Sequence, residues 1–149
     1  MLTGLVLTQF LPDPALAARW FEVQLLRDLG YAPHLAECAV CHAPLPGAWG
    51  QGETFALSAL LGGALCPLHA HPAHNEDHSA LSLGALRLLL ALDALGPNAR
   101  ETLPALPIPG PKNLDLTRLA LRRSLRLRLE RDLKSLEFLD SLRHAAPAP

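Results

Sequence analysis

Two short stretches, ECAVCHAPL (residues 37–45) and GGALCPLHA (residues 62–70), decide how this chain is organised. The first contains Cys38-x-x-Cys41 and the second contains Cys66-x-x-His69, with residues 42–65 between them. Zn²⁺ binds four sulfur or nitrogen ligands in a tetrahedron, and a two-residue gap lets one tight turn supply two of them. The spacing therefore predicts a zinc ribbon that holds one structural Zn²⁺ per chain through three thiolates and one imidazole.

The fourth ligand of this site has alternatives. His69 repeats the spacing of the first cysteine pair, but His71 and His74 follow closely and could take its place. A competing interpretation is that the cysteines are small buried hydrophobes without a metal. A redox-active cysteine pair is disfavoured, because the prolines directly behind the first pair prevent the helix that would lower a thiol pKa.

A catalytic zinc would need an open coordination position and a nearby general base. Polar residues behind the second ligand pair could serve such a site: His71, His74, Glu76, Asp77 and His78. We favour a solvated loop for this segment, because four ligands already close the metal site. The chain also has no phosphate-binding glycine loop and no recognisable nucleophile motif. The sequence therefore predicts a protein that is not an enzyme.

Composition narrows the class of protein further. Half of the 149 residues are apolar, 18% are charged and the net charge is −1, which excludes a disordered chain and a general nucleic-acid coat. Charged residues, glycines and prolines interrupt every long apolar stretch, so we expect no membrane span. The first residues lack the basic flank and the small-residue cleavage site of a signal peptide, so we expect none. Three cysteines cannot pair completely. We therefore expect a soluble, intracellular, cytoplasmic protein.

The fold class predicted from the pattern is mainly α, with a small zinc ribbon inserted between helices. Leucine periodicity and capping residues predict helices over about 13–30, 79–95 and 115–143, with Ser79 or Ser82 capping the second. Short strands are expected around 53–57 and 63–65, and a stiff proline-spaced connector over 103–111. We expect two units: residues 1–31 with 79–149 as a helical domain, and residues 32–78 as the inserted ribbon with its following loop.

The last predicted helix is the basic part of the chain, with nine Lys or Arg against five Asp or Glu over residues 112–143. Arg118, Arg122 and Arg126 recur every four residues, with Arg123 beside them, so their guanidinium groups could pair with neighbouring phosphates. The competing interpretation is a solvated helix face held by intrahelical ion pairs, such as Arg128 with Asp132.

The stretch FEVQLLRDLGYAPHLAECAVCHAPL (21–45), the Gly-Gly before Cys66 and LKSLEFL (133–139) together resemble the C-terminal region of bacterial RecO. This sequence departs from the family pattern at His69, where cysteine is usual, and at His42, where glycine is usual. Family members begin with an oligonucleotide-binding barrel that this sequence does not contain. The resemblance implies a non-enzymatic, nucleoid-associated mediator of DNA repair and recombination, with RecR, SSB and single-stranded DNA as partners.

Two further functions remain open at this stage. A protein-interaction module with no DNA binding of its own could receive an acidic-hydrophobic peptide, such as the SSB tail, in a leucine-lined groove between the helices at 79–95 and 115–143. A zinc hydrolase would use the histidine cluster. Because the barrel is absent and few arginines can reach phosphates, we expect this chain alone to bind single-stranded DNA weakly.

Overall fold

The computed structural model describes residues 13–45, 49–50, 52–70, 78–97 and 109–145. The expected apolar segment at 1–12 and most of the proline-spaced connector lie outside these ranges. Within them, the chain forms in order α2 (Pro14–Asp28), β1 (Phe55–Ser58), β2 (Gly63–Leu65), β3 (His78–Leu81), α3 (Leu83–Leu95) and α4 (Pro111–Ala145). The prediction of a mainly α fold with a small ribbon between helices is confirmed. Among the helices so described, none is long and apolar enough to cross a membrane.

Local capping residues set both ends of α2. The Asp13 side chain accepts hydrogen bonds from the backbone N–H groups of Ala15 and Leu16, and Pro14 occupies the first helical position. These contacts satisfy N–H groups that have no partner within the helix. At the other end Gly30 takes a positive φ of 87°, which a glycine adopts at little cost.

The sheet is antiparallel with strand order β2-β1-β3. β1 and β2 form the expected hairpin, in which Leu57 pairs with Ala64. The third strand was not predicted, and the expectation of a helix from residue 79 is wrong at that end. Ser79 pairs with Leu57 of β1 and cannot cap a helix, because it lies inside β3. Ser82 is the N-cap of α3 and accepts a hydrogen bond from the Ala85 N–H at 3.1 Å.

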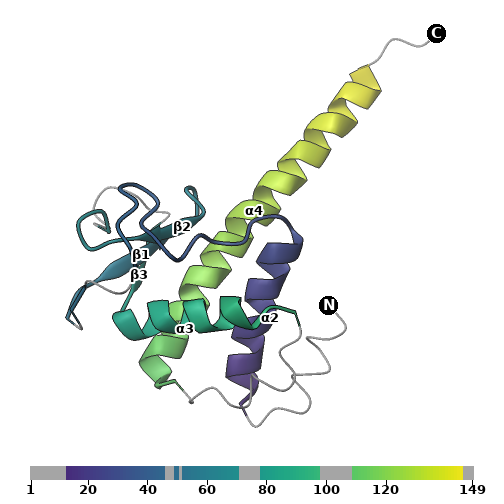
Figure 1. Ribbon diagram of the computed structural model, residues 1–149. Coiled ribbons are helices and arrows are strands. Elements are labelled where there is room, and N and C mark those ends of the chain that lie inside the picture. Colours follow the sequence, from purple (N-terminus) through teal and green to yellow (C-terminus); the bar gives the residue numbers. More distant parts are fainter. Residues whose placement is uncertain (1–12, 46–48, 51, 71–77, 98–108, 146–149) are drawn as a thin grey trace.

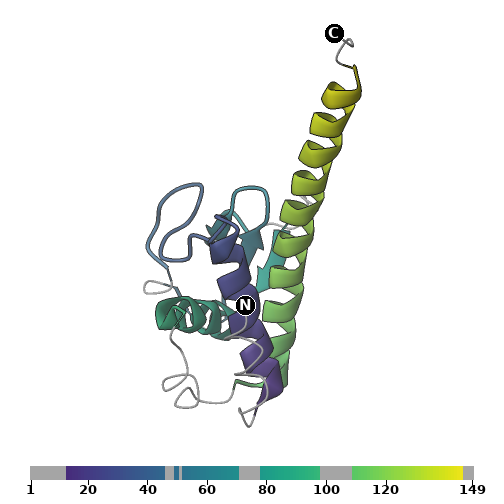
Figure 2. The ribbon, with the colours of Figure 1, turned by 90° about the vertical axis from the view of Figure 1, so that its right-hand side faces the viewer.

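α4 begins four residues earlier than expected, at Pro111. A proline is tolerated in the first helical turn because its missing N–H would have no partner there. Figures 1 and 2 show α2 and α3 lying against the N-terminal part of α4, whereas its C-terminal part extends past the rest of the described chain. The leucine stripe of α4 is therefore divided: Leu121 is fully buried, but Leu133 is 59% exposed.

The core joins all three helices to the sheet. Every described helix and strand contributes at least one of the largest fully buried side chains. These are Trp20, Val23 and Leu26 of α2, Phe55, Leu57, Leu65 and Leu81 of the strands, and Leu86, Leu89, Leu92 and Leu121 of α3 and α4. Two polar contacts hold α2 against the end of α3. The Trp20 indole N–H donates to the Gly96 carbonyl at 3.0 Å, and Arg27 pairs with Asp93 at 2.6 Å.

Candidate metal centre and arginine groove

The first cysteine pair lies on a tight turn between α2 and β1. The Cys38 carbonyl accepts a hydrogen bond from the His42 N–H, and the Cys38 N–H donates to the Ala43 carbonyl, both at 2.9 Å. The Val40 N–H points at the Cys38 sulfur, 3.5 Å away. This backbone pattern closes the loop within a few residues and brings Cys41 back beside Cys38.

The second pair directly follows β2. Cys66 is buried one residue after the strand, and the His69 N–H donates to the Cys66 carbonyl at 2.9 Å. This turn aims the Nδ1 atom of His69 at the Cys66 sulfur, 3.3 Å away. The hairpin therefore carries the second pair to the first, as the spacing predicted.

Cys38, Cys41, Cys66 and His69 form one cluster whose ligand atoms all lie within 4.8 Å of one another. The Cys41 and Cys66 sulfurs are 3.7 Å apart, and the Cys38 sulfur is 3.8 Å from His69 Nδ1. A tetrahedral Zn²⁺ with Zn–S near 2.3 Å and Zn–N near 2.0 Å requires ligand–ligand distances of about 3.5–3.8 Å. The donor set and its geometry thus fit a four-coordinate metal ion. His71 and His74 lie outside the described residues.

The thiol pKa values show that this cluster is suited to a cation. Burial raises the pKa of Cys38, but backbone N–H groups of Cys41, Cys66 and Val40 outweigh burial and lower it to about 6. Burial raises the pKa of Cys66 to about 11, and the neighbouring thiols add to that rise. A site with one thiolate disfavours a second ionised thiol unless a cation compensates the charge. A bound metal ion would supply that compensation.

His42 occupies the one non-glycine position of positive φ within the described residues, at 62°. L-residues with a Cβ are strained in this conformation, which explains why glycine would suit the position after Cys41. The His42 ring lies 3.2 Å from the Glu37 carboxylate, and both side chains are exposed. Because exposed pairs contribute little, this contact does not offset the backbone strain.

Backbone hydrogen bonds attach the first cysteine turn to β2. The His34 N–H donates to the Gly62 carbonyl and the His34 carbonyl accepts from the Ala64 N–H, while the Ala39 N–H donates to the Ala64 carbonyl. The two segments are so close that a Cβ at Gly63 would lie 2.9 Å from the His34 carbonyl oxygen. The Gly-Gly pair is visible in the sequence but its role here is not, since the only local signal is the glycine itself.

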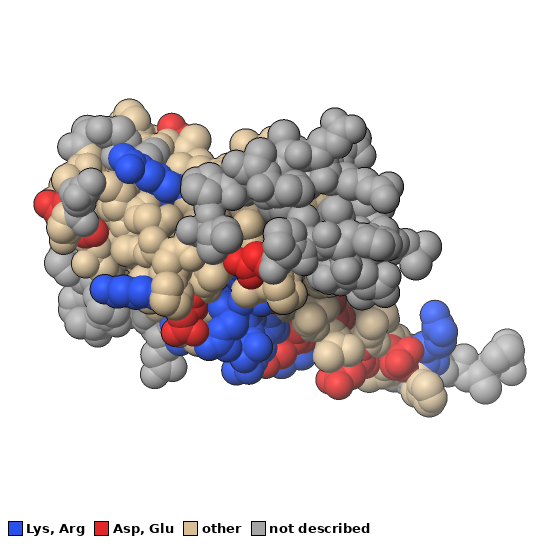
Figure 3. All heavy atoms as spheres, turned by 90° about the horizontal axis from the view of Figure 1, so that it is seen from below, with Lys and Arg blue, Asp and Glu red and all other residues tan. Residues whose placement is uncertain are grey.

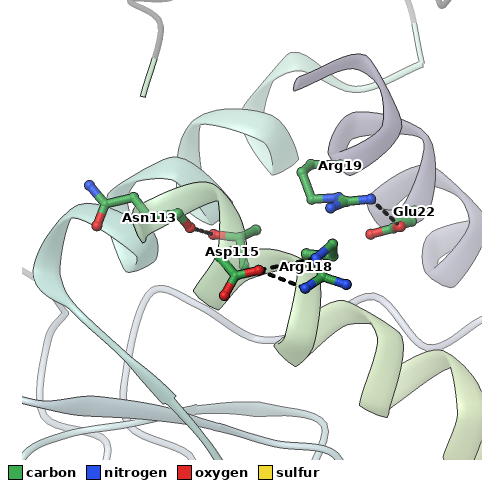
Figure 4. Close-up of polar contacts among 6 residues, drawn as sticks. Arg19, Glu22, Asn113, Asp115 and Arg118 are labelled. Carbon is green, nitrogen blue, oxygen red and sulfur yellow. Dashed lines mark hydrogen bonds and ion pairs between the residues drawn. The ribbon is translucent and has the colours of Figure 1, made fainter. Parts of the chain in front are cut away.

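The four predicted anion-binding arginines separate into two groups. Arg118 donates to the Asp115 carboxylate at 2.6 and 3.2 Å, as Figure 4 shows. Arg122, Arg123 and Arg126 instead line an open groove of about 520 Å³ between α4 and β3. Arg123 is held there by a 2.7 Å hydrogen bond to the His78 carbonyl. Figure 3 shows basic side chains gathered on the face of the molecule seen from below.

The groove also has an apolar side. Leu116 and Leu119 of α4 line it, together with Ser79 and Ala80 of β3. The groove was expected between residues 79–95 and 115–143, and Ser79 and Ala80 of β3 belong to the first of these ranges. Leu86, Leu89 and Leu92 of α3 are fully buried in the core and do not line it.

A largely buried ion pair lies close to the arginines. The Arg19 guanidinium contacts the Glu22 carboxylate at 2.7 Å, and the two side chains are only 10% and 19% exposed (Figure 4). Burial raises the pKa of the Glu22 carboxyl, whereas the positive charges of Arg19, Arg122 and Arg118 oppose that rise. Glu22 of α2 therefore lies close enough to Arg118 and Arg122 of α4 for their charges to act on it.

Arg128 does not form the expected ion pair with Asp132 but contacts other residues. Its guanidinium lies over the Tyr31 ring, 4.5 Å from the ring centroid, and donates to the Ala59 carbonyl at 3.1 Å. Cation–π contact and a partly buried carbonyl hold the side chain better than a solvated carboxylate. Arg128 therefore ties α4 to the end of β1 and to the residue after Gly30.

Comparison with known proteins places the chain in one family. Residues 2–137 match the family model described as "Recombination protein O C terminal". A DNA repair protein RecO of Roseiflexus sp. (strain RS-1) is 40% identical over 130 residues, covering 86% of this chain and 41% of the relative. One of Symbiobacterium thermophilum is 37% identical over 134 residues, covering 90% of this chain and 49% of the relative. No solved structure matches this chain significantly.

The chain spans less than half the length of these relatives. The match to the family model, over residues 2–137, covers the stretch 21–45 and both metal-ligand pairs. This chain belongs to the RecO family of DNA repair proteins and corresponds to its C-terminal region.

Proposed function

We propose that this chain is a non-enzymatic module of DNA repair and recombination that contacts single-stranded DNA through the groove between α4 and β3. The observation that carries the proposal is the convergence of Arg122, Arg123 and Arg126 on this groove. Among the described residues, the side chains of Arg122 and Arg126 form no hydrogen bond and no ion pair within 4 Å. Their guanidinium groups are therefore available to pair with phosphate oxygens.

The number of available arginines limits the affinity. The charge of Arg118 is paired with Asp115, whereas Arg123 donates only to the neutral His78 carbonyl. Three arginines therefore keep an unpaired charge for phosphates: Arg122, Arg123 and Arg126. Three contacts to a single strand give a logarithmic salt slope near −0.7 × 3, or about −2. We therefore expect weak binding with little sequence preference, which fades as the salt concentration rises to the physiological range.

The test is fluorescence anisotropy of a labelled oligothymidine at low salt. Replacing Arg122 and Arg126 with Ala should remove most of the binding. A matched control replaces Arg131 and Lys134 with Ala, because these residues carry the same charge on an exposed part of the same helix. If both double variants lose affinity equally, the groove is not the DNA site.

The second candidate function is recognition of an acidic peptide that ends in an aromatic residue, such as the SSB tail. It is favoured by Leu116 and Leu119, which give the groove an apolar wall beside the arginines. Calorimetric titration with such a peptide distinguishes it from DNA binding. Loss of heat on replacing Leu119 with Ser, with DNA binding unchanged, would support the peptide. Partnership with SSB and RecR, and a place on the nucleoid, rest on family membership.

The metal ion that we propose for the cluster is one structural Zn²⁺ per chain, held by Cys38, Cys41, Cys66 and His69. A four-coordinate site with no open position supplies cross-linking rather than catalysis. Elemental analysis of freshly purified protein should find about one zinc per chain. Cys66→Ser should abolish it, whereas Leu68→Ser, at an exposed position between the ligands, should leave it intact. Protein purified without chelator that contains no zinc would refute the assignment.

A further inference from the structure

The C-terminal part of α4 carries an apolar stripe that the described residues leave exposed. Leu129, Leu133 and Leu136 are 46%, 59% and 59% exposed. Figures 1 and 2 show this part of the helix extending beyond α2, α3 and the sheet. A contiguous row of half-exposed leucines on one helix is typical of a surface that binds a protein.

These leucines continue the line of the arginines on the same helix face. Successive residues of an α-helix are about 100° apart around the axis, so residues seven apart differ by about 20°. Arg122, Leu129 and Leu136 therefore lie along one line. Arg126 and Asp140 lie beside that line, seven residues before and after Leu133. The face runs from two arginines through three leucines to an aspartate.

The charge on this face changes sign along the helix. Arg122 and Arg126 precede the leucines, whereas Glu137, Asp140 and Arg143 follow them, so the net charge of these groups changes from +2 to −1. A second copy laid parallel would bring Arg126 against Arg126 and Asp140 against Asp140. A second copy laid antiparallel and centred on Leu133 would bring each Arg126 against the other chain's Asp140. Charge complementarity therefore selects the antiparallel arrangement.

We propose that two copies of this chain pair antiparallel along residues 122–144 of α4. Leu129, Leu133 and Leu136 form the centre of the contact, and Arg126–Asp140 ion pairs flank it on both sides. The overlap is about three heptads, roughly 34 Å long. Contact over this length buries roughly 1,000 Å², at the low end for specific interfaces, so we expect a weak, reversible dimer.

Sedimentation velocity of the full chain over a micromolar to submillimolar series tests this. The mass should rise with concentration from 16.0 kDa towards twice that value. Leu133→Glu should weaken dimerisation at least tenfold. The matched control is Phe138→Glu, because Phe138 is 63% exposed but lies on the opposite side of the helix. A chain that stays monomeric throughout, or equal effects of the two variants, would overturn the proposal.

A charge exchange tests the direction of the pairing. Arg126→Asp and Asp140→Arg should each weaken the dimer at low salt, and the double variant should restore it. Neither residue is in the core, so circular dichroism should show the same helix content for all four proteins. Dimerisation that requires Leu133 but is not restored in the double variant would refute the antiparallel arrangement. The experiment uses neither DNA nor peptide, so its readout does not require the groove to function. Arg126 also lines the groove, so pairing of two copies and phosphate binding would compete for this residue.

Discussion

Gly63 offers a test of how the metal cluster is assembled, because it is not a ligand. Its position between the His34 carbonyl and the side chain of Ala39 leaves no room for a Cβ, which would lie 2.9 and 3.3 Å from them. The His34 oxygen belongs to the backbone and cannot rotate away. Gly63→Ala must therefore push the first cysteine turn away from β2.

The cost follows from the hydrogen bonds at this contact. Three backbone bonds of 2.8–2.9 Å join residues 34–39 to residues 62–64. A shift that breaks two of them costs about 2 kcal/mol, at about 1 kcal/mol each. Because metal binding and folding of such a site are coupled, this cost appears as roughly 30-fold weaker metal binding. All four ligands remain present.

The measurement is competition for Zn²⁺ against a chromophoric chelator. Gly52→Ala is the matched control, because a Cβ at Gly52 has no neighbour within 4 Å. We expect the control to bind zinc like the unaltered chain and Gly63→Ala to bind it more weakly. Equal zinc affinity in all three proteins would show that contact with β2 does not position Cys38 and Cys41.

Three further predictions concern the fold. His42→Gly should raise stability by about 1 kcal/mol in denaturant unfolding, because it relieves a positive φ; an unchanged midpoint would mean that this turn is unstrained. Trp20→Phe should lower stability by about 1 kcal/mol, because it removes the hydrogen bond to the Gly96 carbonyl. Full retention of stability would show that this hydrogen bond is not formed. Leu121→Ala should lower the free energy of unfolding by about 2–5 kcal/mol, because Leu121 is fully buried. Leu139 is 56% exposed, so Leu139→Ala should change that free energy by no more than about 0.5 kcal/mol. Similar losses in the two variants would show that the C-terminal part of α4 is packed.

The parts of the fold that could be predicted are those whose causes are local in sequence. A two-residue spacing between Cys38 and Cys41 encodes a turn, and the same spacing from Cys66 encodes the second. The beginnings of two helices depend on Asp13 and Ser82, whose side chains bond to N–H groups two or three residues away. In each case, the residues that determine the structure are neighbours in the chain.

The strand β3 could not be predicted, because its cause is not local. Residues 78–81 are only four long and run directly into a leucine-rich helix, so their own pattern favours the helix. Their partner is β1, about twenty residues earlier, where Ser79 pairs with Leu57. The same holds for Arg128, whose neighbour Asp132 is visible in sequence but whose contacts with Tyr31 and Ala59 come from folding.

The sheet explains why a metal cluster and an arginine groove occur in one small protein. Cys66 directly follows β2 at one edge, and the first cysteine turn is bonded to the same strand. β3 forms the opposite edge and lines the groove, where the His78 carbonyl fixes Arg123. β1 pairs with both strands, so the metal cluster and the arginines are connected through a single layer of backbone hydrogen bonds. We therefore expect a metal ion bound at this cluster to restrain β3 through β2 and β1, although none of the four ligand residues lines the groove.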